Sequence, residues 1–211
     1  MLQANGLAIL LLIGCSLTIL ACDAQTNEKK ESFISGKTAA KALVVTYSYT
    51  GNTKAVADEI INRFKADPVT IMAKDYDGFS GGMRASYDAW TEVILTTIEP
   101  ETVDMSQYDL VFLGSPIWWY RPAVPLWTFV EKNDFTGKTV VLFNTFNSRF
   151  KSEYIEEFKS LVEKNGGQFT DHLYVKRGRW YAQLSKAELL EKFTTQLDIE
   201  EESYNSIISN Q

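Results

Sequence analysis

The strongest constraint in this sequence is a short polar segment, Thr46–Thr53, that lies between a predicted strand and a predicted helix. Before it, the apolar and β-branched run Lys41–Val45 predicts a buried strand. After it, Lys54–Ile61 has the composition of a helix. The first N–H groups of a helix lack internal partners, and the helix dipole favours an anion there. The segment is therefore typical of a phosphate-binding turn.

The residues within this segment suit a phosphate. Ser48, Thr50 and Thr53 can donate O–H groups without adding charge. Gly51 lets the backbone approach a ligand closely. The Gly-Lys-Ser/Thr ending of a P-loop is not present, because Asn52 follows the glycine. Hydroxyl residues in such a turn can also serve only as helix N-caps, so the segment needs support from the rest of the chain.

Strand and helix patterns alternate along the rest of the chain. The predicted strands are Lys41–Tyr47, Val69–Met72, Tyr108–Gly114, Thr139–Phe143 and Phe169–Val175. The predicted helices are Asn52–Lys65, Met83–Ile98, Pro122–Glu131, Lys151–Lys164 and Ser185–Leu197, the last opened by the capping box Ser185–Glu188. This alternation predicts an α/β fold, an open doubly wound parallel sheet of five strands with helices on both faces. We expect one domain over residues 41–198, followed by a polar tail over 199–211.

Three predicted loops should meet at one edge of this sheet, where open parallel sheets bind ligands. The first is the phosphate-binding turn. The second, Ser115–Pro122, carries Trp118 and Trp119, and the third, Asn144–Arg149, places amides and hydroxyls around Phe146. A ligand with a phosphate at one end and a flat heteroaromatic ring at the other would contact all three. Adjacent residues rarely share a face, and the sequence leaves open which tryptophan packs inward.

These segments resemble the flavodoxin-like family, whose ligand is flavin mononucleotide (FMN). Ser48–Thr53 is similar to the family's phosphate loop, and Gly114–Trp119 resembles most closely a branch of oxidoreductases with a Pro-Ile-Trp-Trp signature. Asn144–Ser148 occupies the position of the second flavin-flanking loop but lacks the glycines of that branch. The resemblance covers about residues 41–197 and implies the strand order 2-1-3-4-5. It implies FMN contacts from Ser48, Tyr49, Thr50, Gly51, Asn52, Thr53, Pro116, Ile117, Trp118, Trp119, Tyr120, Asn144, Thr145, Phe146, Asn147 and Ser148.

The N-terminus has the pattern of an export or anchor segment. Residues 1–22 contain no charged side chain, and Gly6–Ala21 is almost continuously apolar. The run ends in Ile19-Leu20-Ala21-Cys22, which resembles a bacterial lipobox with Cys22 as the lipidated residue. Cys15 is a second candidate, and an uncleaved anchor or a misassigned start codon would also explain why the first residues carry no lysine or arginine. We predict a membrane-anchored, extracytoplasmic lipoprotein with a flexible tether over residues 23–40.

Composition excludes some partners and cofactors. The net charge of −6 and the pI near 5.0 argue against nucleic acid as a partner. Because the net charge is −6, we expect acidic groups around the flavin. The same charge is compatible with electrostatic pairing to a basic redox partner. The chain has one histidine, His172, and two cysteines, both in the leader, and we find no clustered metal ligands.

The resemblance implies a redox flavoprotein, in which the flavin carries the electrons and no catalytic side chain is required. A one-electron carrier and a two-electron reductase, acting with a partner protein or a small-molecule donor or acceptor, stay open. The alternative is an exported binding or scaffold lipoprotein that keeps the fold without flavin. Arg177–Trp180 could contact the flavin edge or a pyridine nucleotide phosphate, or form only a solvated turn.

Overall fold

The computed structural model describes residues 41–92 and 95–209. The predicted leader, tether, Cys15 and Cys22 lie outside these residues. Among the described helices, none is both long enough and apolar enough to cross a membrane. The strands are β1 (Lys41–Tyr47), β2 (Asp67–Ile71), β3 (Tyr108–Trp118), β4 (Arg121–Pro122), β5 (Thr139–Phe146) and β6 (Gln168–Lys176). The helices are α1 (Asn52–Phe64), the 3₁₀ turn η1 (Lys74–Tyr76), α2 (Gly78–Trp90), α3 (Val124–Lys132), α4 (Ser152–Lys164) and α5 (Lys186–Ser209).

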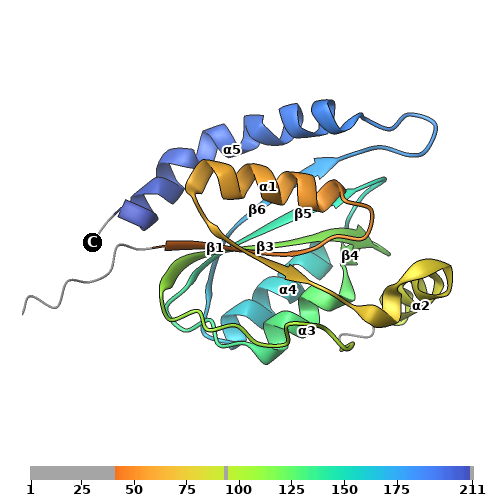
Figure 1. The fold of residues 1–211 in the computed structure, drawn as a ribbon, viewed down its shortest axis with the longest axis horizontal. Coiled ribbons are helices and arrows are strands. Elements are labelled where there is room, and N and C mark those ends of the chain that lie inside the picture. The colour runs from red at the N-terminus through yellow and green to blue at the C-terminus, as the bar shows by residue number, and fades with distance from the viewer. Residues whose placement is uncertain (1–40, 93–94, 210–211) are drawn as a thin grey trace, which may run out of the picture. The chain divides into compact units, whose positions relative to one another are not determined.

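The sheet confirms the predicted fold class and strand order (Figure 1). Its path runs β2-β1-β3-β5-β6 with every neighbouring pair parallel. The two-residue strand β4 lies off this path and pairs antiparallel with the end of β3. The chain moves outward from β1 to β2 and then returns past β1 to β3. The point between β1 and β3 is therefore the topological switch point.

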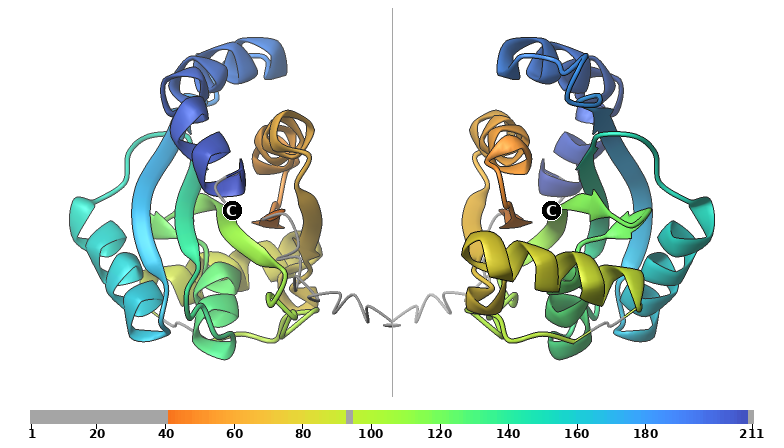
Figure 2. Two further views of the ribbon diagram at one scale, coloured as in Figure 1. Left: turned by 90° about the vertical axis from the view of Figure 1, so that its left-hand side faces the viewer. Right: turned by 90° about the vertical axis from the view of Figure 1, so that its right-hand side faces the viewer.

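Helices cover both faces of the sheet, with α1 and α5 on one face and α3 and α4 on the other (Figures 1 and 2). The strands are apolar on both sides for this reason. In β3, Leu110 and Phe112 face the core under α1 and α5, while Val111 and Leu113 face the opposite core. All four side chains are fully buried. This two-sided burial fixes the positions of the strand ends that carry the site.

Helix α2 corrects the prediction for Met83–Ile98. It begins at Gly78 and ends at Trp90, and its buried residues are Gly81, Ala85 and Ala89. Tyr87 and Trp90, the large apolar residues of the predicted helix that lie within α2, are each 60% exposed. At Gly81 the helix approaches the backbone of Tyr76 so closely that a larger side chain would not fit.

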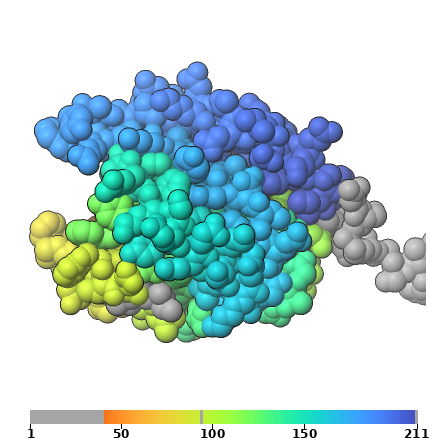
Figure 3. Space-filling view, turned by 180° about the vertical axis from the view of Figure 1, so that it is seen from behind, coloured from red at the N-terminus to blue at the C-terminus, as the bar shows by residue number. Residues whose placement is uncertain are grey.

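Helix α5 corrects the predicted tail. The capping box is confirmed, since the Ser185 backbone N–H donates to Glu188 Oε2 over 2.8 Å and the Glu188 N–H donates to Ser185 Oγ over 3.3 Å. The helix does not end near Leu197 but continues to Ser209. Tyr204 is buried there, and its hydroxyl donates to Asp171 Oδ2 over 2.7 Å. Seen from behind, α5 forms a continuous layer, and the loop before it projects at one end (Figure 3).

Gly81→Ala is expected to lower the free energy of unfolding by on the order of 2 kcal/mol. A Cβ at this position would lie 2.3 Å from the carbonyl carbon of Tyr76, so the helix would have to move. Gly82→Ala is the matched control, because its Cβ would meet only the outer end of the Tyr49 ring, an exposed side chain that can turn away by giving up its hydrogen bond to the Gly78 carbonyl. In the Gly82→Ala control, the higher helix propensity of alanine should raise the free energy of unfolding by up to about 1 kcal/mol. Urea denaturation measures both variants, and equal losses of stability would contradict the close packing of α2.

Candidate cofactor site

The candidate site lies where the parallel strands end, and two of its predicted loops begin later than expected. Pro116, Ile117 and Trp118 belong to β3, because this strand continues into an antiparallel pairing with β4. The predicted third loop is likewise shortened, because β5 continues to Phe146 in register with β6. The predicted site residues are thus held mainly by strand ends, which are more rigid than free loops.

One hollow of about 260 Å³ brings residues of all three predicted segments together. We call it the main hollow. It is lined by Tyr49, Thr50, Asn52, Pro116, Ile117, Trp118, Thr145, Phe146, Asn147, Arg177 and Gln183. The last two come from the loop after β6 and were not assigned to the site with the others. A smaller hollow of about 190 Å³, the linking hollow, is lined by Ile117, Trp119, Tyr120, Phe146, Asn147, Ser148 and Arg149. The two hollows share Ile117, Phe146 and Asn147, so they adjoin.

The N-terminus of α1 has the geometry of an anion site. Gly51 precedes the helix with φ of 82°, a conformation that favours glycine. The Lys54 N–H donates to Ser48 Oγ over 3.1 Å, and the Asn52 amide donates to Thr50 Oγ1 over 2.9 Å. The N–H groups of the first helical residues precede the first intrahelical bond and face the turn. No acidic residue lies in the first turn to compete for them.

Two predicted hydroxyl groups have partners inside the protein. Thr53 is buried, and its hydroxyl lies 2.8 Å from the hydroxyl of Thr145 at the end of β5. This bond fixes the start of α1 against β5. Thr53 therefore serves the site through its position and its backbone N–H.

Lys186 is a site residue that the sequence reasoning missed. Its ammonium nitrogen lies 3.9 Å from the point where a Cβ on Gly51 would stand. The capping box at Ser185 predicts that a helix begins there. Only the packing of α5 beside α1 shows that the helix start places a cation next to the phosphate-binding turn.

The structure separates the two tryptophans. Trp118 packs against the core, with edge-on contacts at 5.6 Å to the rings of Tyr47 and Tyr49, and it also lines the main hollow. Trp119 is 49% exposed, and its indole N–H donates to Ser86 Oγ over 2.8 Å. Trp118 is therefore the inward-packing residue of the pair.

The turn between β3 and β4 is a two-residue hairpin with unusual backbone. Trp119 and Tyr120 have φ of 45° and 71°, the left-handed region that few non-glycine residues adopt. The turn is held by Arg121, which is buried with its guanidinium 4.4 Å from the centre of the Trp127 ring. Strained backbone of this kind is concentrated at functional sites. In this turn the side chains of Trp119 and Tyr120 both line the linking hollow.

Asn144 corrects one predicted contact, since it lies behind the site and not on its surface. Its side chain is fully buried, and its amide N–H donates to the Ser115 carbonyl over 2.8 Å. Its oxygen lies 2.9 Å from His172 Nε2 and accepts from the ring N–H. Burial lowers the pKa of His172 to about 4, so the ring is neutral near pH 7. This chain of bonds joins the ends of β3, β5 and β6.

The charge around the site differs from that of the whole chain. The segments after β1, β3, β5 and β6, residues 48–51, 119–120, 147–151 and 177–185, contain no aspartate or glutamate. Together with the adjoining strand and helix ends they contribute the cations Arg149, Lys151, Lys176, Arg177, Arg179 and Lys186, against the carboxylates of Glu153 and Glu188 in the first turns of α4 and α5. The expected acidic surround is therefore wrong at this edge. Over the described part of the chain, no three histidine, cysteine, aspartate or glutamate residues gather as a metal site would require.

Comparison with known proteins identifies the family. A family model described as flavodoxin matches residues 41–167, more than half of the chain, and the protein belongs to the flavodoxin family. Flavodoxin 1 of Escherichia coli K12 is 30% identical over 77 residues, a match covering 33% of this chain and only 44% of that relative's length.

Solved structures match over more of the chain. A candidate flavoprotein from Bacteroides uniformis has a TM-score of 0.57 at 23% identity, covering 74% of this chain and 99% of that one. A flavoprotein from Lactobacillus acidophilus solved in complex with FMN has a TM-score of 0.55 at 20% identity, covering 74% of this chain and 99% of that one. At these identities the likeness concerns the fold.

Protein stability is expected to fall as the pH decreases from 6.5 to about 4. The pKa of His172 is lowered from 6.5 to about 4 by burial, against the opposite effect of Asp171. In this interval the unfolded chain binds a proton that the folded chain does not, so stability rises with pH and falls on acidification. Over this pH interval the free energy of unfolding should fall by about 3 kcal/mol at most.

The His172→Gln variant removes the titrating ring and should show a flatter dependence over the same interval. Urea denaturation of both proteins at several pH values between 4 and 7 measures the difference. Parallel curves for the two proteins would contradict the assignment to His172.

Proposed function

We propose that this domain binds FMN non-covalently and acts as a redox protein. The observation that carries the proposal is the joining of a carboxylate-free helix N-terminus to an aromatic hollow at the switch point between β1 and β3. The main and linking hollows are each smaller than typical sites of roughly 300–1,000 Å³, but they adjoin and together reach that range. A molecule with a phosphate and a large planar ring suits this shape.

Each part of the site has a task in holding the cofactor. The first N–H groups of α1, the Thr50 hydroxyl and the Lys186 ammonium would bind the phosphate. Trp118 and Phe146 would bury one part of the ring system, and Trp119 and Tyr120 would cover its outer part. Asn144 and His172 keep the strand ends in register beneath it. The bound FMN supplies the electron transfer, while the protein excludes water and sets the local charge.

The comparisons support the cofactor more directly than the finer role. The chain belongs to the flavodoxin family, and one structural neighbour was solved in complex with FMN. We further propose that Pro116–Trp119 places the protein in the oxidoreductase branch with a Pro-Ile-Trp-Trp signature. Rapid bleaching of the flavin by NADH or NADPH would support a reductase. Two separate one-electron steps in a reductive titration would support an electron carrier.

Absorbance spectroscopy of the purified protein with added FMN tests the proposal. We expect a yellow protein, or a colourless one whose added FMN shows a perturbed flavin spectrum on binding. A colourless protein that binds no added FMN would overturn the proposal. That outcome would favour a flavin-free binding or scaffold protein with the same fold.

The phosphate contacts should be separable from the ring contacts. We expect Thr50→Ala and Lys186→Ala each to weaken FMN binding roughly tenfold, since each removes a group that binds the phosphate. Neither should change the affinity for riboflavin, which lacks the phosphate. Trp180→Ala, which alters an 87% exposed side chain, and Lys192→Ala, farther along α5, are the matched controls. Equal losses for both ligands, or in the controls, would contradict this placement of the phosphate.

We also propose that the N-terminus anchors the protein to a membrane through a lipid on Cys22, with the domain outside the cytoplasm. The support is the apolar run that ends at Ala21-Cys22 and the polar segment after it. Cells that express the full chain with labelled palmitate should incorporate the label, and Cys22→Ser should abolish it while Cys15→Ser should not. The reverse result would assign the lipid to Cys15, and no label in any of the proteins would leave an uncleaved anchor.

A further inference from the structure

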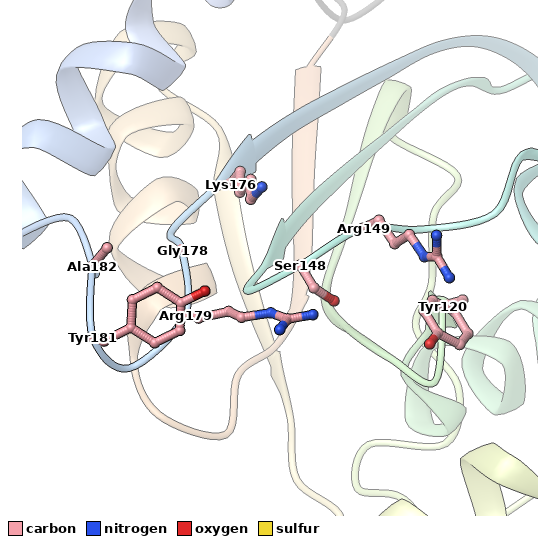
Figure 4. Close-up of a pocket in the computed structure, with 8 residues that line it drawn as sticks. All are labelled: Tyr120, Ser148, Arg149, Lys176, Gly178, Arg179, Tyr181 and Ala182. Atoms are coloured by element: carbon pink, nitrogen blue, oxygen red, sulfur yellow. The ribbon is translucent and has the colours of Figure 1, made fainter.

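A third and larger hollow adjoins the linking hollow and shares no lining residue with the main hollow. It has a volume of about 520 Å³ and is lined by Tyr120, Ser148, Arg149, Lys176, Gly178, Arg179, Tyr181 and Ala182 (Figure 4). We call it the basic cavity. Its lining comes from the β3–β4 turn, the segment after β5 and the loop after β6. It shares Tyr120, Ser148 and Arg149 with the linking hollow, so the two adjoin.

The basic cavity carries positive charge without compensation. Arg149, Lys176 and Arg179 line it, and no carboxylate does. Across the residues that the structure describes, none of these three side chains takes part in an ion pair. Ion pairs occupy cations elsewhere, such as Lys54 and Arg63 on α1. In a protein of net charge −6, three unpaired cations around one cavity favour an anionic ligand.

The loop after β6, which carries Arg179, is held in shape by its own backbone. The Leu184 N–H donates to the Arg177 carbonyl over 2.8 Å, and the Arg177 N–H donates to the Phe146 carbonyl over 2.7 Å. Gly178 has φ of 96°, and a Cβ on it would lie 2.3 Å from the Ala182 carbonyl oxygen. Arg179 therefore extends from a closed, glycine-dependent turn, and Lys176 stands beside it at the end of β6. Preorganised cations lose less entropy on binding.

Aromatic groups accompany the cations. The Arg149 guanidinium lies 5.1 Å from the centre of the Tyr120 ring. Tyr181 is 68% exposed at the opposite side of the cavity, and in Figure 4 Arg179 extends from the loop in the direction of Ser148. Guanidinium groups bind phosphate through paired hydrogen bonds, and tyrosine rings stack on planar bases. The cavity is also far larger than a single inorganic anion needs.

We propose that the basic cavity binds a phosphorylated aromatic small molecule of nucleotide type, placed next to the cofactor site. A concave site enclosed by three segments fits a small molecule better than a flat protein surface. Binding in the cavity requires only this chain's residues, whereas its place beside FMN rests on the proposed function. The ring of such a ligand would approach the linking hollow, and its phosphates would contact Arg179 and Lys176.

The test is calorimetric titration of the full-length protein with ADP in the presence of saturating FMN. We expect ADP to bind, and adenosine and inorganic pyrophosphate each to bind at least about tenfold more weakly, because one lacks the charge and the other the ring. Arg179→Gln and Lys176→Gln should each raise the Kd for ADP roughly tenfold. Lys65→Gln removes the same charge at the far end of α1 and should leave the Kd unchanged. The FMN affinity of Arg179→Gln should equal that of the wild type.

Four results would overturn the proposal. Loss of ADP binding on addition of FMN would place ADP in the main hollow. Pyrophosphate binding as tight as ADP would reduce the cavity to a simple anion site. If Arg179→Gln had no effect on the Kd for ADP, ADP would not bind in the basic cavity. If no probe bound at all, an acidic protein partner would be the remaining candidate ligand of the basic cavity. Should FMN itself not bind, the proposed function fails, and titration of the flavin-free variants with ADP still decides the cavity.

Discussion

The candidate site depends on a buried chain of hydrogen bonds that joins the ends of three neighbouring strands. Asn144 on β5 donates to Ser115 on β3 and accepts from His172 on β6. Unpaired, these buried polar groups would cost on the order of 1–3 kcal/mol each, so the strand ends are held in one register. The bond between Thr53 and Thr145 adds the start of α1 to the same assembly. The candidate cofactor surface is thus held in place by buried hydrogen-bonded groups at the strand ends.

Local charge at this edge opposes the charge of the whole protein. The helices that follow the parallel strands begin at this edge, so their unpaired N–H groups and positive dipole ends point to the same side of the sheet. The segments there add arginine and lysine and no carboxylate. An anion approaching this edge meets a positive potential even though the net charge is −6. This local potential favours both the proposed cofactor phosphate at the start of α1 and an anion in the basic cavity.

Hydrophobic periodicity predicted most elements but misjudged α2. The helix predicted over Met83–Ile98 begins and ends earlier in the structure, and its apolar residues Tyr87 and Trp90 are mostly exposed. The buried residues of α2 are instead Gly81, Ala85 and Ala89, and at Gly81 the backbone of Tyr76 leaves no room for a Cβ. This contact depends on how the chain turns from η1 into α2, which the spacing of apolar residues does not show. The end of α5 was missed because Tyr204 gains its burial from Phe64 on α1 and Phe112 on β3, which are far away in the sequence.

The sequence alone determined the α/β class and the short polar turn between β1 and α1, because these follow from local patterns, whereas the strand order came from the resemblance to the flavodoxin-like family. The rule that open parallel sheets bind ligands at the carboxyl ends of their strands located the candidate site. It also identified most residues of the main hollow. Tertiary structure decided which tryptophan packs inward, that Asn144 lies behind the surface, and that Lys186 reaches Gly51. It also gathered Arg149, Lys176 and Arg179 around one cavity. Each of these depends on the distance between segments that are remote in the chain, and only the packed sheet and its helices set that distance.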